Sequence, residues 1–261
     1  MKCSQLLKRM ILICSFLPLT VFAAGAWKAA EFTDGDFKLP YQLYEPERSG
    51  NEALPLVISL HGSGEAGTDN TAQLYAGQNI GPDYFASNTI QSIQKAFVLA
   101  PQTPGPIRWA NTNLGEYDMD TTPPTVSMAA LLKLLDQLKT NPAIDPKRIY
   151  MTGLSRGGQG VWYSALLRPN DFAAIVPMAG AGSPKHAGRI ATLPIWAFHG
   201  NADTTTTVAV TRNMVNALRA AGATDATLKY TEIEGGEHSS SWLTAHKNSE
   251  LWQWMLKWQK K

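Results

Sequence analysis

The sequence predicts a single doubly wound α/β domain with a mainly parallel sheet and helices on both faces. Strand-like and helix-like segments alternate from about residue 37 to the end of the chain. Several strand-like segments, such as residues 56–60 and 195–198, are continuous apolar runs, which is typical of strands buried on both faces of a parallel sheet. The length of 261 residues fits one such domain, and no internal repeat or long linker divides it.

The first 23 residues are expected to form an export signal. Lys2, Lys8 and Arg9 precede an apolar stretch at residues 10–19, and the small residues around Ala23 fit a cleavage after Ala23, with Ala26 as the alternative. The apolar stretch is short for a comfortable membrane span. We therefore expect the remainder, residues 24–261, to be one domain without a stable membrane span, located in the periplasm or secreted.

Removal of this signal changes the charge balance of the chain. The signal holds three of the 23 basic residues and none of the 21 acidic ones, which leaves 20 basic against 21 acidic residues. No basic excess remains to attract a nucleic acid, so we expect no nucleic-acid partner. Both cysteines, Cys3 and Cys14, also lie in the signal. The remainder must therefore be stabilised by its core, without disulfides.

The elements follow from local pattern. Strands are expected, in chain order, at residues 37–44, 56–60, 96–100, 148–152, 174–178, 195–198 and 228–233. Helices are expected over the apolar stripe from 128 to 138, then at residues 159–167, 208–221 and 249–260. The segments 62–95 and 102–125 are less periodic. Because each follows a strand end, we expect both to border the binding site.

A candidate nucleophile lies between the strand at 148–152 and the helix at 159–167. The intervening residues, Gly153-Leu154-Ser155-Arg156-Gly157, match G-x-S-x-G, and a strand, this motif and a helix together form the context of a nucleophile elbow. Side chains at 153 and 157 would collide with the neighbouring strand or helix, which glycine avoids. The alternative is an ordinary glycine-rich turn between a strand and a helix.

Two further residues complete a catalytic pattern in the order Ser, Asp, His. Asp203 follows the strand at 195–198, and His238 follows the strand at 228–233. A histidine can take the serine proton, and a carboxylate can fix its tautomer and stabilise the imidazolium. The sequence therefore predicts that Ser155, Asp203 and His238 form a catalytic triad.

Acyl transfer also needs two N–H donors for the oxyanion. One is expected from the backbone of Arg156, directly after the nucleophile, and the other from the loop His61-Gly62-Ser63-Gly64-Glu65. Ser63 is the first choice and Gly62 the second. The alternative is a flexible turn without this role. The Arg156 side chain is expected to form an ion pair with Glu65 that braces the oxyanion loop at the pocket. The alternatives are that it binds a substrate carboxylate or other polar group, or that it lies partly exposed on the surface.

Two aromatic residues are candidates for the substrate pocket. Trp109 lies in the loop after the strand at 96–100, and Trp242 follows the candidate base closely. Either ring could supply apolar area to an acyl or alcohol group, and plain core packing is the equal alternative for each.

The other four histidines are expected to have no catalytic role. His61 and His199 are expected to stabilise their loops, and His186 and His246 to lie on the surface. No histidine or cysteine pair has metal-ligand spacing, and no glycine-rich dinucleotide motif opens a helix after the first strand. We therefore expect neither a metal nor an organic cofactor.

These segments resemble a known group of proteins. The runs at 60–67, 100–102 and 148–158, continued by 199–203 and 236–238, are similar to exported esterases of the α/β-hydrolase superfamily. That group includes polyhydroxybutyrate-depolymerase-like, feruloyl-esterase-like and predicted peptidase or phospholipase/carboxylesterase sequences. The resemblance implies an α/β-hydrolase fold over about residues 37–258. The chain departs from the group at Arg156, where a methionine or other apolar residue is frequent, and at residues 204–207, where valine and proline usually follow the acid.

The resemblance implies a cofactor-independent serine hydrolase that acts on small or polymeric carboxylic esters through an acyl-enzyme. A serine peptidase with the same triad is the alternative, although such peptidases often carry an added gating domain for which we expect no room here. A catalytically inactive binding protein on the same scaffold is a further alternative. The motifs indicate neither the acyl nor the alcohol group, nor the oligomeric state.

Overall fold

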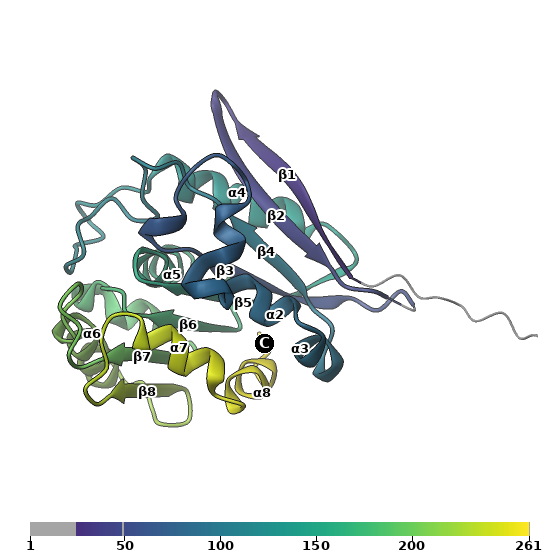
Figure 1. Ribbon diagram of the computed structural model, residues 1–261. Coiled ribbons are helices and arrows are strands. Elements are labelled where there is room, and N and C mark those ends of the chain that lie inside the picture. Colours follow the sequence, from purple (N-terminus) through teal and green to yellow (C-terminus); the bar gives the residue numbers. More distant parts are fainter. Residues whose placement is uncertain (1–24, 49, 261) are drawn as a thin grey trace, which may run out of the picture.

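The computed structural model describes residues 25–48 and 50–260, and the expected signal at 1–23 lies outside them. The described strands form one eight-stranded sheet in the order β1-β2-β4-β3-β5-β6-β7-β8 (Figure 1). Strand β2 pairs antiparallel with β1 and with β4, and every other neighbouring pair is parallel. The predicted mainly parallel, doubly wound sheet is confirmed.

The seven predicted strands are all present, with ends that differ by a few residues. The strands are β1 (Ala26–Asp34), β2 (Phe37–Glu45), β3 (Leu54–Leu60), β4 (Phe97–Pro101), β5 (Ile144–Leu154), β6 (Ala174–Met178), β7 (Ile195–Gly200) and β8 (Leu228–Ile233). Strand β1 was not predicted, because none of its residues is buried and polar residues interrupt its apolar pattern. The Gly35-Asp36 loop that joins it to β2, with φ of 60° at Gly35, is the hairpin signal that could have revealed it.

The four predicted helices are also present, although the last is shorter than expected. The longer helices are α4 (Val126–Lys139), α5 (Arg156–Leu167), α6 (Ala209–Ala220), α7 (Ser240–Lys247) and α8 (Glu250–Leu256). The segment 62–95 holds short pieces that periodicity did not predict: η1 (Ser63–Glu65), η2 (Ala72–Tyr75), α1 (Ala76–Asn79), α2 (Gly81–Ala86) and α3 (Asn88–Ile93). One 3-10 helix, η3 (Pro184–Ile190), follows β6. In the described part of the chain, no helix is long and apolar enough to cross a membrane.

Helices cover both faces of the sheet and bury two separate cores. On β3, Leu56 and Ile58 join the core beneath α4, α5 and α6, whereas Val57 points to the core beneath α2, α3, α7 and α8. Figure 1 shows α7 and α8 in front of the sheet and α5 behind it. Continuous apolar strands therefore fill both cores by alternation, as the sequence pattern predicts.

This topology gathers the candidate residues at one edge of the sheet. His61 follows β3, Ser155 follows β5, Asp203 follows β7 and His238 follows β8. Strands β3, β5, β6, β7 and β8 run parallel, so their carboxyl ends lie on the same side. A binding site is expected outside that edge in such a sheet.

Candidate active site

Ser155 lies on a strained turn between β5 and α5. Its backbone has φ of 54° and ψ of −118°, a conformation that a residue with a side chain rarely adopts. A Cβ atom at Gly157 would lie 2.0 Å from the Leu60 carbonyl oxygen, and one at Gly153 would lie 2.6 Å from the Gly157 backbone. The predicted need for glycine at 153 and 157 is confirmed. The elbow holds the serine side chain at the end of the sheet, where α5 begins.

His238 connects Ser155 with Asp203 through its two ring nitrogens. Its Nδ1 lies 2.6 Å from Asp203 Oδ2, and its Nε2 lies 2.9 Å from Ser155 Oγ. The carboxylate can only accept hydrogen bonds, so Nδ1 carries a proton and its N–H group donates a hydrogen bond to Asp203. In the neutral ring Nε2 is then an acceptor, and the Ser155 hydroxyl donates to it. The imidazole is therefore in the tautomer that can take the serine proton.

The carboxylate of Asp203 is fully buried and fixed from several sides. Its Oδ1 accepts hydrogen bonds from the backbone N–H groups of Thr205 and Thr206 at 2.8 and 2.9 Å. His199 Nε2 lies 3.2 Å from Oδ2 and donates to the Thr206 carbonyl at 2.8 Å. Burial lowers the pKa of His199, which favours a neutral ring that braces the turn. The predicted structural role of His199 agrees with these contacts.

His61 joins two loops beside the site. Its Nδ1 donates to the Gly62 carbonyl at 2.6 Å, and its Nε2 accepts from the Thr103 N–H at 3.0 Å. Burial lowers the pKa of His61 to about 4, so the ring is neutral near pH 7. The Trp109 indole N–H also donates to the His61 carbonyl, at 3.1 Å. The predicted structural role of His61 is consistent with this network, which fixes the 61–65 loop against the 102–109 loop.

The candidate oxyanion donors begin helices. Ser63 is the first residue of η1 and Arg156 the first of α5, so neither backbone N–H has an acceptor within its own helix. The N–H of Gly62, the second choice from sequence, instead donates to Glu65 Oε2 at 3.0 Å. This bond leaves Ser63 as the better candidate. Burial raises the pKa of Glu65, although the bond from Gly62 opposes that shift.

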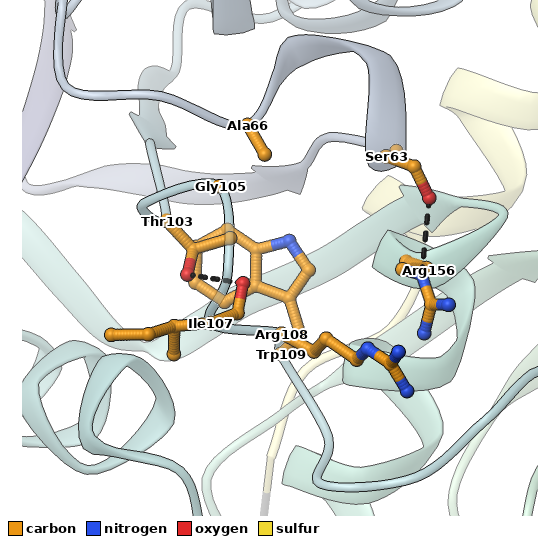
Figure 2. A pocket seen from close by; sticks show the side chains of 9 residues that line it. Ser63, Ala66, Thr103, Gly105, Ile107, Arg108, Trp109 and Arg156 are labelled. Atoms are coloured by element: carbon orange, nitrogen blue, oxygen red, sulfur yellow. Dashed lines mark hydrogen bonds between the residues drawn. The ribbon is translucent and has the colours of Figure 1, made fainter.

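The expected ion pair between Arg156 and Glu65 is wrong. Both residues lie in the described part of the chain, and no ion pair joins them. The Glu65 carboxylate closes its own tight turn on Gly62. Arg156 Nε donates instead to Ser63 Oγ at 3.1 Å, the bond drawn in Figure 2, and Arg156 Nη1 donates to the Thr112 carbonyl at 3.3 Å.

A groove of about 300 Å³ opens over Ser155 and His238, and we call it the catalytic groove. Trp242 forms part of its wall, and the indole meets the His238 ring edge-on with centroids 5.1 Å apart. Glu65 lines the groove as well. These positions agree with the pocket roles expected for both residues. Trp242 also limits the directions in which the imidazole can move.

Trp109 both packs in the core and lines a pocket, the two alternatives that the sequence left open. Its side chain is only 1 % exposed and packs in the core beneath α4 and α5. The ring also forms a wall of a second pocket, of about 230 Å³, beside the catalytic groove (Figure 2). The two cavities share Gly62 and Ser63 as lining residues.

His186 and His246 are buried, so the surface positions expected for them are wrong. His186 contacts Ser183 at 2.9 Å within the η3 region, and His246 donates to the Trp242 carbonyl at 2.8 Å. Neither lies in a continuous apolar run, and tertiary packing rather than local pattern covers them. Sequence periodicity carries no signal for such burial.

One group of side chains has the composition of a metal site. Asp118, Asp120 and His186 bring possible ligand atoms within 4.8 Å of one another. Lys185 already forms ion pairs with both carboxylates, at 2.8 and 2.9 Å. The ammonium group thus supplies the positive charge that a cation would bring.

Sequence reasoning missed several residues that line the two cavities. These residues carry no motif: Gly77, Gln78, Arg108 and Thr205. Only the two less periodic segments as a whole were expected to border the site, and both do.

Comparison with known proteins agrees with this geometry. Residues 45–246 match the family model described as phospholipase/carboxylesterase. The chain belongs to this family of α/β-hydrolases. A solved structure described as a thermostable esterase is 33% identical with a TM-score of 0.81, and the match covers 89% of this chain and 63% of that one.

Two curated relatives are more distant. Poly(3-hydroxyalkanoate) depolymerase C of Paucimonas lemoignei is 26% identical over 68% of this chain and 40% of its own length. A probable carboxylesterase of Oryza sativa subsp. japonica is 26% identical over 56% of this chain and 66% of its own length. The matched part thus spans less than two thirds of either relative.

Proposed function

We propose that this chain is a serine hydrolase that cleaves carboxylic esters. The observation that carries the proposal is the continuous hydrogen-bonded chain from Ser155 through His238 to the buried carboxylate of Asp203. Its position at the carboxyl edge of the sheet, in a member of a carboxylesterase family, supports the same conclusion.

In the first half-reaction the Ser155 hydroxyl attacks the ester carbonyl. His238 Nε2 accepts the serine proton as the new C–O bond forms, and Asp203 stabilises the resulting imidazolium. The carbonyl oxygen becomes negative and accepts hydrogen bonds from the backbone N–H groups of Ser63 and Arg156. Collapse of this intermediate breaks the bond to the alcohol. The imidazolium returns its proton to the leaving alcohol, and an acyl-serine remains.

In the second half-reaction water takes the place of the alcohol. His238 accepts a proton from the water as its oxygen attacks the acyl carbon, and the same two N–H groups again hold the oxyanion. The intermediate then releases the carboxylic acid, and the proton returns from His238 to Ser155 Oγ. No redox step or cofactor enters this balance.

The strained backbone at Ser155 supports the proposed nucleophilic role. A conformation of this kind costs on the order of 1–3 kcal/mol and persists where the surrounding structure enforces it. Here the Ser155 N–H donates to the Met178 carbonyl at 2.9 Å, which ties the turn to β6. The serine is therefore held in place before substrate binds.

Replacement of Ser155 by alanine tests the proposal. We expect kcat for a small ester such as p-nitrophenyl butyrate to fall by about 10⁴-fold or more, because triad members act as a unit. Ser92→Ala, at an exposed serine of α3, is the matched control. Circular dichroism should show both variants folded. Activity of Ser155→Ala within about tenfold of the parent would reject the proposal.

The class of ester is the next question for this site. The proposed substrates are small or polymeric carboxylic esters, as the depolymerase and carboxylesterase relatives suggest. A panel of p-nitrophenyl esters, feruloyl esters and short hydroxyalkanoate oligomers would rank them. The amide counterpart of the best ester belongs in the panel. Amide cleavage at a comparable rate would point to a peptidase instead.

We also propose that residues 1–23 direct export. The basic start, the short apolar stretch and the small residues near Ala23 support this proposal. Expression of the full chain in a Gram-negative host, followed by mass measurement of the protein outside the cytoplasm, tests it. A mature protein that begins at residue 24 is the expected result. Retention of the uncleaved chain in the cytoplasm would reject the proposal.

A further inference from the structure

The second pocket has an unusual electrostatic character, and we call it the arginine pocket. Arg108 and Arg156 lie on its wall, as Figure 2 shows. Its remaining lining is small or apolar and includes no carboxylate: Gly62, Ser63, Ala66, Thr103, Gly105, Ile107 and Trp109. Two guanidinium groups therefore face a cavity whose lining carries no negative charge.

The two guanidinium groups converge on one carbonyl. Arg108 Nη1 donates to the Thr112 oxygen at 2.7 Å, and Arg156 Nη1 donates to the same oxygen at 3.3 Å. Arg108 Nη1 also contacts Asn113 Oδ1 at 3.0 Å, and Arg156 Nε is bonded to Ser63. Each guanidinium offers five N–H donors. Within the described residues, Arg156 Nη2 and the Nε and Nη2 atoms of Arg108 have no acceptor.

Nothing in the described chain neutralises this pair of charges. Neither arginine forms an ion pair with a carboxylate of residues 25–48 or 50–260. Partial burial, and to a lesser extent the charge of Arg108, lower the pKa of Arg156. Both effects disfavour two adjacent cations without a counterion. A planar carboxylate suits the unused donors, because a guanidinium binds it through two parallel hydrogen bonds.

We propose that the arginine pocket binds a carboxylate carried by the acyl part of the substrate, so that the preferred substrates are half-esters of dicarboxylic acids. This proposal rests on the ester hydrolysis proposed above and specifies its substrate class. Arg156 and Arg108 are then specificity-determining residues. The apolar wall of Trp109 and Ile107 would contact the carbon chain between the ester and the carboxylate.

The acyl side follows from the position of His238. The imidazolium gives its proton to the leaving alcohol, so the alcohol part lies on the His238 side of Ser155. His238 and Trp242 line the catalytic groove and do not line the arginine pocket. The two cavities meet at Gly62 and Ser63, where the oxyanion is proposed to bind. The arginine pocket therefore lies across the oxyanion donors from the leaving group.

Three esters of similar size test this assignment. The first is monoethyl adipate, with its carboxylate on the acyl part, and the second is the amide ethyl adipamate, its neutral counterpart. The third is 4-(butanoyloxy)butanoate, with its carboxylate on the alcohol part. The parent protein is expected to have kcat/KM at least tenfold higher for the first ester than for either of the others, since charge-assisted hydrogen bonds to arginine distinguish them.

Arg108→Gln is the decisive variant, because Arg108 lies outside the proposed catalytic residues. The ratio of kcat/KM for monoethyl adipate over ethyl adipamate is expected to fall about tenfold or more. Arg108→Lys, which keeps the charge without the planar fork, should restore part of the ratio. Arg219→Gln removes an equal charge from an exposed position in the last turn of α6 and should leave the ratio unchanged. Melting temperatures check that the variants are folded.

A direct binding measurement separates this proposal from the proposed reaction. Ser155→Ala titrated with monoethyl adipate by calorimetry should bind it, and the additional change Arg108→Gln should weaken that binding about tenfold or more. Equal kcat/KM for the charged and neutral acyl esters, preference for the alcohol-side carboxylate, or an unchanged ratio in Arg108→Gln would overturn the arginine-pocket proposal while leaving ester hydrolysis intact. Failure to hydrolyse any ester would reject the proposed function itself.

Discussion

Two buried histidines should make this protein lose stability between pH 7 and pH 5. Burial lowers the pKa of both His61 and His246 to about 4, from an ordinary value of 6.5. The contacts agree with neutral rings. His61 Nε2 accepts the Thr103 N–H, and His246 Nε2 is buried without a partner among the described residues. Protonation of His61 would remove its hydrogen bond from the Thr103 N–H. Protonation of His246 would bury a positive charge without a partner.

The sign and the size follow from proton linkage. Above pH 6.5 both states hold neutral imidazoles, so the stabilisation is complete. As the pH falls from 6.5 toward 4, both imidazoles become protonated in the unfolded chain but stay neutral in the folded chain, so the folded state loses stability. A pH of 5 lies 1.5 units below the pKa of 6.5 that the imidazoles have in the unfolded chain. One unit corresponds to about 1.4 kcal/mol, so each histidine costs about 2 kcal/mol, and the two together about 4 kcal/mol.

Urea unfolding followed by tryptophan fluorescence at pH 7 and pH 5 measures this loss. His246→Gln removes one titrating ring and can still donate to the Trp242 carbonyl. The variant should lose about 2 kcal/mol less than the parent between the two pH values. His61→Gln should recover a similar share. Comparison of parent and variant cancels the contribution of the carboxylates. An equal loss in parent and both variants would refute the reasoning.

Three further predictions concern the site and its turns. Asp203→Asn should lower kcat on a small ester by about 10²-fold or more, because the His238 tautomer is no longer fixed. Asp225→Asn, at an exposed residue, should leave kcat unchanged, and a larger loss in Asp225→Asn than in Asp203→Asn would identify a different acid. Gly157→Ala should destabilise the fold by about 1–3 kcal/mol, because its Cβ would lie 2.0 Å from the Leu60 oxygen. Gly64→Ala, whose Cβ would meet nothing within 4 Å, should keep the melting temperature of the parent, and equal melting temperatures for the two variants would contradict the clash. Glu65→Ala should lower kcat more than Glu65→Gln, because the amide oxygen can still accept the Gly62 N–H; steady-state kinetics with equal losses would count against this loop anchor.

The sheet and the order of candidate residues could be predicted from the sequence because both depend on local pattern. Continuous apolar runs define β3 and β7, and turns that follow them hold His61 and Asp203. In a parallel sheet the ends of such strands meet at one edge, so sequence order and strand ends together place Ser155, Asp203 and His238 in one region.

The contacts of charged side chains could not be predicted in the same way. The expected partner of Arg156 was Glu65, yet the Glu65 carboxylate caps its own turn and Arg156 extends to Ser63 and Thr112. Which acceptor a long side chain reaches depends on loop geometry, and residues 102–125 carry no periodic signal. The arginine pocket could not be predicted from the sequence either, because Arg108 belongs to that loop.

Covalent labelling tests the central claim, that Ser155 is the nucleophile of an ester hydrolase, most directly. The protein would be incubated with diethyl p-nitrophenyl phosphate, and the adduct would be located by peptide mass spectrometry while ester hydrolysis is followed in parallel. The account predicts one diethyl phosphoryl group on Ser155, loss of activity in proportion to labelling, and no adduct in Ser155→Ala. Full inactivation with the adduct on another residue, or undiminished activity after complete labelling of Ser155, would contradict it.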